Sequence, residues 1–374
     1  MPLCIRGFVR PDGSVGTRNN LLVVSMSDLC NEIALKIARA VPGSVALLTP
    51  AGSLSFGEEA RLVSGLRSRV CANPNVGAIL VVGPIATENA AVAAEARTLG
   101  RLAGAVSLLD HIDGQGAVRA GIHVGRHLRR ELASTRRREV AIDALRLGLK
   151  SSVSNAESVR YANPAVGSLV DLVSNRGAGV CITELVDLCG DPAAVIERAA
   201  TRKAAREIYA ALREPLRLMQ QMGPDVPDPT PMNIMGGIVT IARKSRGALK
   251  RLGRSPIKSA IRFGDEVPGD GLHLMAGPAS CALSLMGLAA AGCTLIVHTV
   301  GLTGATASSP LVPMIKIGGP SLRGSRDVDL FLDNRNTRVV QLADITFKVA
   351  SGARTASERG GERSIMLPNS LPLL

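Results

Sequence analysis

Four short apolar runs in the first 135 residues are each followed by a stretch with helical periodicity, and this alternation constrains the fold more than any other feature. The runs are almost continuously apolar, which is typical of parallel strands covered by helices on both faces of a sheet. Repeated strand–helix alternation predicts βαβ units. The predicted strands are residues 20–26, 44–49, 77–83 and 104–110.

The second half alternates less regularly but in the same way. We therefore predict an α/β fold of two packed domains, residues 1–135 and 136–350, each a parallel sheet with helices on both faces. Residues 351–374 are polar and then proline-rich, and we predict a tail that is partly extended or mobile. The predicted strands of the second domain are residues 144–152, 177–185, 272–277, 293–300 and 312–318.

The composition limits the class of protein. Aromatic residues make up 2% of the 374, so the cores must be aliphatic. The seven cysteines form no CxxC pair, and the N-terminus "MPLCIRGFVRPDG" lacks the apolar segment of a signal peptide. No apolar run is long enough to cross a bilayer. We expect a cytoplasmic protein with reduced thiols and no membrane partner.

The formal net charge is +13, and much of it lies in two basic clusters, residues 126–138 and 243–262. Three interpretations remain open: solvated helix faces, attraction of small anions such as carboxylates, and binding of nucleic acid. The third lacks stacking aromatics and a known reader motif, so we expect no nucleic-acid partner.

Residues 228–247, "DPTPMNIMGGIVTIARKSRG", are too rich in proline and glycine for a predicted helix and too polar for a predicted core strand. We predict a rigid loop in which Gly236 and Gly237 let the backbone approach another group closely. Asn233 and Lys244 would then face that group.

Three stretches together resemble one family, the altronate/galactarate dehydratases. They are "GFVRPDGSVGTRN" (7–19), "GLKSSVSNAESVRYANPAVG" (148–167) and residues 228–247. The last is similar, without a gap, to the family's Asn-Pro-Ser-Pro-Gly-Asn-x-x-Gly-Gly segment. Weaker similarities at "ITELVDLCGDP" and "GPASCALSLMGLAAAGCTLIVHTVGLTG" extend the resemblance over roughly residues 5–320. We expect this chain to lack the small SAF-type domain that many members carry, which in some members is a separate subunit.

The resemblance implies an iron-dependent lyase that removes water from a sugar acid such as altronate or galactarate, or from a related hydroxy acid, to give a 2-keto-3-deoxy acid. Such chemistry needs a base beside the substrate carboxylate, stabilisation of the enediolate and an acid for the leaving hydroxyl. The implied cofactor is Fe(II) or another divalent metal. The implied partners are a small anionic hydroxy acid, a separate SAF-type subunit and further copies of the chain.

Several positions depart from the family pattern. The family's Cys is Ser151, its Asp residues are Asn155 and Cys281, and its Arg after Thr-Gly is Leu302. The two acids before Lys244 are replaced by Ala242 and Arg243. Because metal-capable groups are lost while glycines and prolines persist, the resemblance identifies no metal ligands in this chain.

The carboxyl ends of parallel strands and the family motifs select two sets of candidate residues. Each has a structural alternative: helix caps for Glu184 and Asp187, a core position for His298, and an anchor of the N-terminal loop for Arg18. The catalytic candidates are Glu184, Asp187, Lys244 and His298. The substrate-binding candidates are Arg18, Asn31, Ser154, Asn155, Asn163, Asn233, Gly236, Gly237, Ser245, Thr299 and Lys316.

Three hypotheses for function remain open. The first is an active carbon–oxygen lyase with an altered substrate range. The second is a catalytically impaired paralogue that binds a small organic acid or serves as a subunit, which the lost acids and cysteines favour. The third is another reaction on the same scaffold that uses His298 or Cys281.

Overall fold

The computed structural model describes residues 4–52, 57–222, 231–333, 338–368 and 370. The first domain contains a five-stranded sheet in the order β15-β4-β3-β5-β6, with every strand parallel to its neighbours. Its strands are β3 (Asn20–Ser25), β4 (Ser44–Leu48), β5 (Val76–Gly83), β6 (Leu102–Ser107) and β15 (Ser364–Met366).

Helices cover both faces of this sheet because successive side chains of each strand point to opposite faces and both sets are apolar. Leu21 and Val23 pack with α1 (Asn31–Ala40) and α4 (Gly114–Ala133). On the other face, Leu22 and Val24 share a core with α2 and α3. The bounds of these two helices are Gly57–Ala72 for α2 and Ala86–Thr98 for α3.

The second domain contains a seven-stranded parallel sheet in the order β10-β11-β9-β8-β12-β13-β14. The predicted α/β class, with parallel sheets, is confirmed in both domains. The strands are β8 (Arg146–Ser151), β9 (Gly179–Ile182), β10 (Ile257–Ile261), β11 (Gly271–Met275), β12 (Leu295–Thr299), β13 (Met314–Gly318) and β14 (Leu330–Phe331). The longer helices are α5 (Asn163–Ser174), α7 (Arg202–Met222), α9 (Ile241–Leu249), α10 (Cys281–Ala290) and α11 (Arg338–Ala350).

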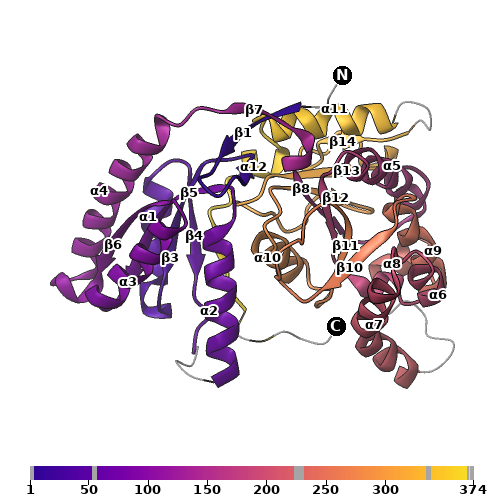
Figure 1. The fold of residues 1–374 in the computed structure, drawn as a ribbon, viewed down its shortest axis with the longest axis horizontal. Coiled ribbons are helices and arrows are strands. Elements are labelled where there is room, and N and C mark those ends of the chain that lie inside the picture. Colours follow the sequence, from indigo (N-terminus) through magenta and orange to yellow (C-terminus); the bar gives the residue numbers. More distant parts are fainter. Residues whose placement is uncertain (1–3, 53–56, 223–230, 334–337, 369, 371–374) are drawn as a thin grey trace.

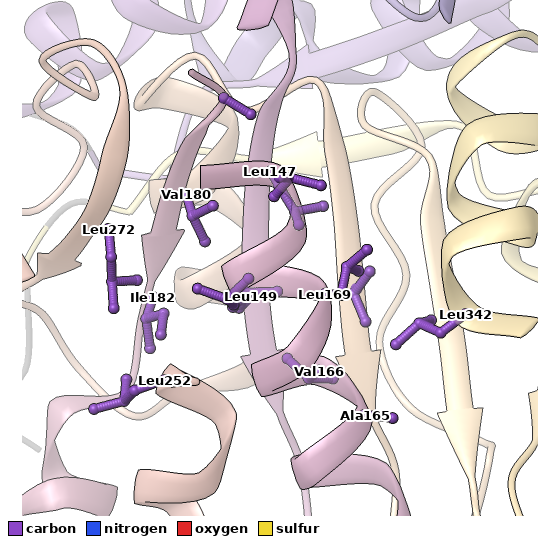
Figure 2. Close-up of a cluster of buried hydrophobic side chains, with 14 of the residues drawn as sticks. Leu147, Leu149, Ala165, Val166, Leu169, Val180, Ile182, Leu252, Leu272 and Leu342 are labelled. Atoms are coloured by element: carbon purple, nitrogen blue, oxygen red, sulfur yellow. The ribbon is translucent and has the colours of Figure 1, made fainter. Parts of the chain in front are cut away.

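The main core of the second domain lies between α5 and the strands β8 and β9 (Figure 2). Leu147 and Leu149 point from β8 toward Val166 and Leu169 of α5, and all four are fully buried or nearly so. Burying a leucine or valine side chain contributes about 1.5–3 kcal/mol, so this aliphatic layer compensates for the scarcity of aromatic residues.

A second core joins the two domains. Helix α2 of the first domain packs against α10, which lies between the two sheets in Figure 1. Polar contacts strengthen the junction: the buried Asn73 amide donates to the carbonyl oxygens of Ala289 and Cys293 at 2.7 and 3.0 Å. The domains therefore form one packed body.

Short segments that the sequence analysis did not predict complete the fold. An antiparallel sheet is formed by β1 (Cys4–Val9), β2 (Val15–Gly16) and β7 (Arg138–Ala141). The remaining short helices are α6 (Pro192–Ile196), α8 (Pro231–Met235) and α12 (Ala356–Gly360). Residues 356–366 form α12 and β15, and β15 pairs with β4, so this part of the tail returns to the first domain. Among the described residues no helix is long and apolar enough to cross a membrane.

The prediction of a non-helical loop at 228–247 is wrong where it can be compared, and residues 228–230 lie outside the described part. Pro231 begins the short helix α8, a position where the missing N–H costs no hydrogen bond. The Thr240 hydroxyl then caps α9 by accepting from the Arg243 N–H. Only residues 236–240 remain outside the helices.

Arg18 fastens the C-terminal segment to the N-terminal loop. Its guanidinium contacts both carboxylate oxygens of Glu358 at 2.6 and 2.9 Å and donates to the carbonyl oxygens of Val349 and Ala353. Burial opposes ionisation of Glu358, but Arg18 outweighs it and lowers the pKa of that carboxyl. The geometry favours the anchoring alternative for Arg18.

We expect Arg18→Ala to lower the free energy of unfolding by about 3 kcal/mol, because it leaves Glu358 as an uncompensated, largely buried charge. Urea unfolding followed by circular dichroism measures this, with the exposed Arg39→Ala as the matched control. Unchanged stability together with lost ligand binding would contradict the anchoring role and return Arg18 to the substrate site.

Candidate active site

Charged side chains gather at the carboxyl ends of the second-domain strands. Lys150, His298 and Lys316 occupy neighbouring strands in register, with His298 paired to Lys150 on β8 and to Lys316 on β13. Their side chains are at most 3% exposed. Strand alternation places the three on the face opposite Leu149, Val297 and Ile317, toward α10. We call them the Lys–His–Lys row.

Glu184 stands at the end of β9 in a left-handed conformation with φ of 62°, and it is the only non-glycine with positive φ among the described residues. This conformation is uncommon and strained for a residue other than glycine. It places one carboxylate oxygen 2.5 Å from the Lys150 ammonium and the other 3.0 Å from the Ser151 N–H. Burial opposes the charge of Lys150, but Glu184 outweighs it and raises the pKa of Lys150.

Asp187 lies in the 3₁₀ turn Leu185–Leu188 and is surrounded by donors. Lys244 and Arg251 contact its two oxygens at 3.0 and 2.9 Å, and the Ser151 hydroxyl donates at 2.8 Å. Burial raises the pKa of Asp187, but these partners outweigh burial and lower it to about 2. The carboxyl is therefore ionised at neutral pH and cannot exchange a proton readily.

His298 is fully buried, and neither ring nitrogen has a hydrogen-bond partner among the described residues. Burial lowers the pKa of His298 well below its ordinary value, and Lys150, Lys316 and Arg251 lower it further. The imidazole is therefore neutral at pH 7. A buried polar group without a partner is costly, so two unpaired nitrogens in one ring mark a position built for a ligand or a proton.

Lys316 is held by a loop that follows β12. Its ammonium donates to the carbonyl oxygens of Gly304 and Thr306, each at 3.0 Å. Burial lowers the pKa of Lys316, although Asp327 and Cys281 partly offset the effect. Cys281, the first residue of α10, is half-buried and also acts on Lys150, which places its sulfur near the row.

The structure thus brings together all four predicted catalytic residues and Lys316. Lys150, Ser151 and Arg251 belong to the same cluster and were not among the candidates. Lys150 could have been found because it is the only charge in the otherwise apolar predicted strand end "LGLK". Arg251 gave no such signal, since it sits in a basic run that resembles a solvated helix face.

Most other predicted substrate-binding residues form hydrogen bonds with the backbone of neighbouring segments. Asn31 exchanges two hydrogen bonds with the backbone of Thr49 in the first domain. Asn163 donates to the Gly247 carbonyl oxygen, and the buried Ser245 accepts from the Gly190 N–H. Thr299 is buried at the end of β12, where its carbonyl oxygen accepts from the Ser152 N–H. A binding role for these four stays a prediction.

The remaining candidates connect two loops beside the cluster. Asn233 accepts from the Ser154 N–H at 2.8 Å, and Asn155 donates to the Gly301 carbonyl oxygen. A Cβ atom at Gly236 would lie 2.6 Å from the Ser154 carbonyl oxygen. The group that the backbone approaches closely at Gly236 therefore belongs to this same chain. Gly237 has φ of 79°, a conformation that favours glycine.

The side chains of this cluster do not fit a divalent metal. The oxygens of Glu184 and Asp187 are engaged by Lys150, Lys244, Arg251 and Ser151. Within the described part of the chain, no group of three or more His, Cys, Asp or Glu side chains is arranged to hold a metal ion. Clustered ammonium and guanidinium groups suit an anion instead.

Two parallel α/β domains with a charged, buried cluster at the strand ends place this chain among α/β proteins whose site, if it binds a ligand there, suits a small anion. Sequence comparison specifies it further. The profile of "D-galactarate dehydratase/Altronate hydrolase, second domain" matches residues 7–133, and that of "D-galactarate/Altronate dehydratase, C-terminal" matches residues 142–372. The chain belongs to the D-galactarate/altronate dehydratase family, which confirms the resemblance.

Similar proteins include altronate dehydratases from Bacillus subtilis and Escherichia coli, each 25% identical, which cover 83% and 96% of this chain. This chain spans 65% and 76% of their respective lengths. The beta subunit of (2R)-sulfolactate sulfo-lyase from Chromohalobacter salexigens is 26% identical, and the match covers 96% of both chains.

The pKa of Asp187 leads to a pH prediction. Because the folded-state value of about 2 lies below the ordinary 3.8, ionised Asp187 stabilises the fold above about pH 4. This contribution, on the order of 2 kcal/mol, is lost as pH falls from about 4 to about 2.

Urea unfolding at pH 6 and pH 3 measures it. Asp187→Asn should be less stable than the wild type at pH 6, and its stability should fall less between the two pH values. The exposed Asp110→Asn is the control. An identical fall in Asp187→Asn and in the wild type would contradict the Asp187–Lys244–Arg251 network.

Proposed function

We propose that this chain carries the catalytic site of a carbon–oxygen lyase that dehydrates a small hydroxy acid to a 2-keto-3-deoxy acid. The observation that carries the proposal is the Lys–His–Lys row, in which an uncharged imidazole with no hydrogen-bond partner in the described part of the chain lies between two ammonium groups. Such an arrangement suits removal of a proton next to a carboxylate that the flanking cations hold.

In this mechanism Lys150 and Lys316 bind the substrate carboxylate, and neutral His298 takes the proton from the adjacent carbon. The electrons of the broken C–H bond form an enediolate, whose charge the two ammonium groups stabilise. The bond to the β-hydroxyl then breaks, and the imidazolium returns the proton to the departing oxygen, which leaves as water. The resulting enol becomes the keto acid.

The other charged residues position this row. Glu184 orients Lys150 through their 2.5 Å contact, and Asp187 holds Lys244 and Arg251. The catalytic role proposed for Asp187 from the sequence is therefore better described as positioning. Because His298 is fully buried, substrate must displace the loop at Gly304 and Thr306. A carboxylate accepts from an ammonium more strongly than these carbonyls do, which supplies a reason for the loop to move.

We also propose that the chain works with a separate small subunit of the SAF type. The altronate dehydratases are longer than this chain, whereas the sulfo-lyase relative of matching length is named as a subunit. That relative also favours a second candidate function, elimination of sulfite from a sulfonated hydroxy acid. The same row would hold the carboxylate, and only the leaving group would differ.

The test is release of product from a panel of aldonic, aldaric and short hydroxy acids and from sulfolactate. Both 2-keto acid and sulfite are measured anaerobically, with and without Fe(II) and with and without an SAF-type subunit. Keto acid without sulfite supports the dehydratase, and sulfite supports the second candidate. No turnover under any condition would overturn both lyase candidates and leave the catalytically impaired paralogue as the remaining interpretation.

We expect His298→Asn to lower kcat by about 100-fold or more, the usual contribution of a general base. The exposed His123→Asn should retain wild-type activity. Since the pKa of His298 is depressed, protonation removes the base only well below pH 6.5, so kcat/KM should stay constant between pH 7.5 and 6.5. A full-activity His298→Asn variant would exclude His298 as the base.

A further inference from the structure

The first domain contains a pocket of about 710 Å³, which the lyase proposal does not use. The described residues that line it come only from the first domain. They follow the carboxyl ends of β3, β4 and β5 or lie on α2. This volume is within the range of sites for small organic ligands.

The pocket lies where the sheet topology favours ligands. Strand β4 pairs with one edge of β3, and the chain then crosses over so that β5 pairs with the other edge. The direction in which strands are added therefore reverses at β3. Ligands of open parallel sheets bind in the crevice outside the carboxyl ends at such a switch point. Ser27 follows β3 and Ile85 follows β5, and both line the pocket.

One wall carries positive charge. Arg61, Ser64 and Arg67 all line the pocket from α2. Neither arginine side chain forms a hydrogen bond or an ion pair with a residue that the structure describes. Burial lowers the pKa of Arg67, which Glu95 and Cys71 oppose electrostatically. A partly desolvated guanidinium with free N–H groups attracts an oxyanion strongly.

The rest of the lining offers acceptors and backbone donors. Glu88 is exposed in the pocket and has no hydrogen bond to a described residue, so its carboxylate can accept from hydroxyl groups. Asp28 is engaged by the Leu29 N–H at 3.0 Å. Helix α3 begins at this part of the lining without a side-chain cap, which leaves N–H groups of its first turn for an anion.

We propose that this pocket binds a small organic anion that carries hydroxyl groups. Arg61 and Arg67 hold the carboxylate or phosphate, and Glu88 accepts from the hydroxyls. Two sources share this chemistry: the hydroxy-acid substrate of the proposed lyase, and a phosphorylated sugar acid that acts separately. The inference does not depend on turnover, because binding is measured without it.

Isothermal titration calorimetry with inorganic phosphate, D-altronate and 6-phospho-D-gluconate tests the proposal. Arg67→Gln should weaken binding of inorganic phosphate and of 6-phospho-D-gluconate at least tenfold, since one charge-assisted contact is lost. Arg119→Gln, on the exposed side of α4, removes the same charge and should bind as the wild type does. His298→Asn, in the other domain, should leave the Kd of inorganic phosphate unchanged.

A second variant tests the role of Glu88 separately from that of the arginines. Glu88→Gln should weaken 6-phospho-D-gluconate several-fold while inorganic phosphate binds at least as tightly as before. Among the binding that Arg67→Gln weakens, tighter binding of D-altronate than of the phosphorylated acid assigns the pocket to the substrate, and the reverse assigns it to a separate ligand. Equal affinities in Arg67→Gln and wild type, or loss of binding in His298→Asn alone, would overturn the proposal.

Discussion

The buried ion pairs at the carboxyl ends of β8 and β9 are the interaction on which the second domain depends. Lys150 and Glu184 join two neighbouring strands, and Asp187 joins that edge to Lys244 and Arg251 beyond it. Each of these charges, if buried without a partner, would strongly destabilise the fold. Together they leave this buried cluster with a net positive charge. His298 is neutral because burial lowers its pKa and the neighbouring positive charges of Lys150, Lys316 and Arg251 lower it further.

Much of the framework could be predicted from the sequence, because long apolar runs report burial directly. All nine predicted strands are present within a few residues of their expected bounds. The short strands β1, β7 and β15 could not be found this way. Each has mixed polarity and owes its conformation to a partner far away in the chain, as β15 does to β4.

The candidate site was predicted in part, for a similar reason. Glu184, Asp187 and His298 follow or end apolar strands, a position that selects them without knowledge of their neighbours. Lys150 and Arg251 are buried only because Glu184 and Asp187 neutralise them, and that pairing spans 34 and 64 residues of sequence. No local pattern indicates the pairing itself, although the single charge in "LGLK" points to Lys150. The same pairing explains why a divalent metal does not fit: in this chain, cations of the protein itself occupy the carboxylates.

The return of β15 to the first sheet has a consequence for the order of folding during translation. The ribosome releases β3 and β4 early, but the strand that covers the free edge of β4 follows only after the second domain has been made. An uncovered strand edge is a site for wrong pairing with other chains. The edge of β4 therefore stays unpaired during synthesis of the second domain. The backbone hydrogen bonds between β4 and β15 form only after that domain has been made.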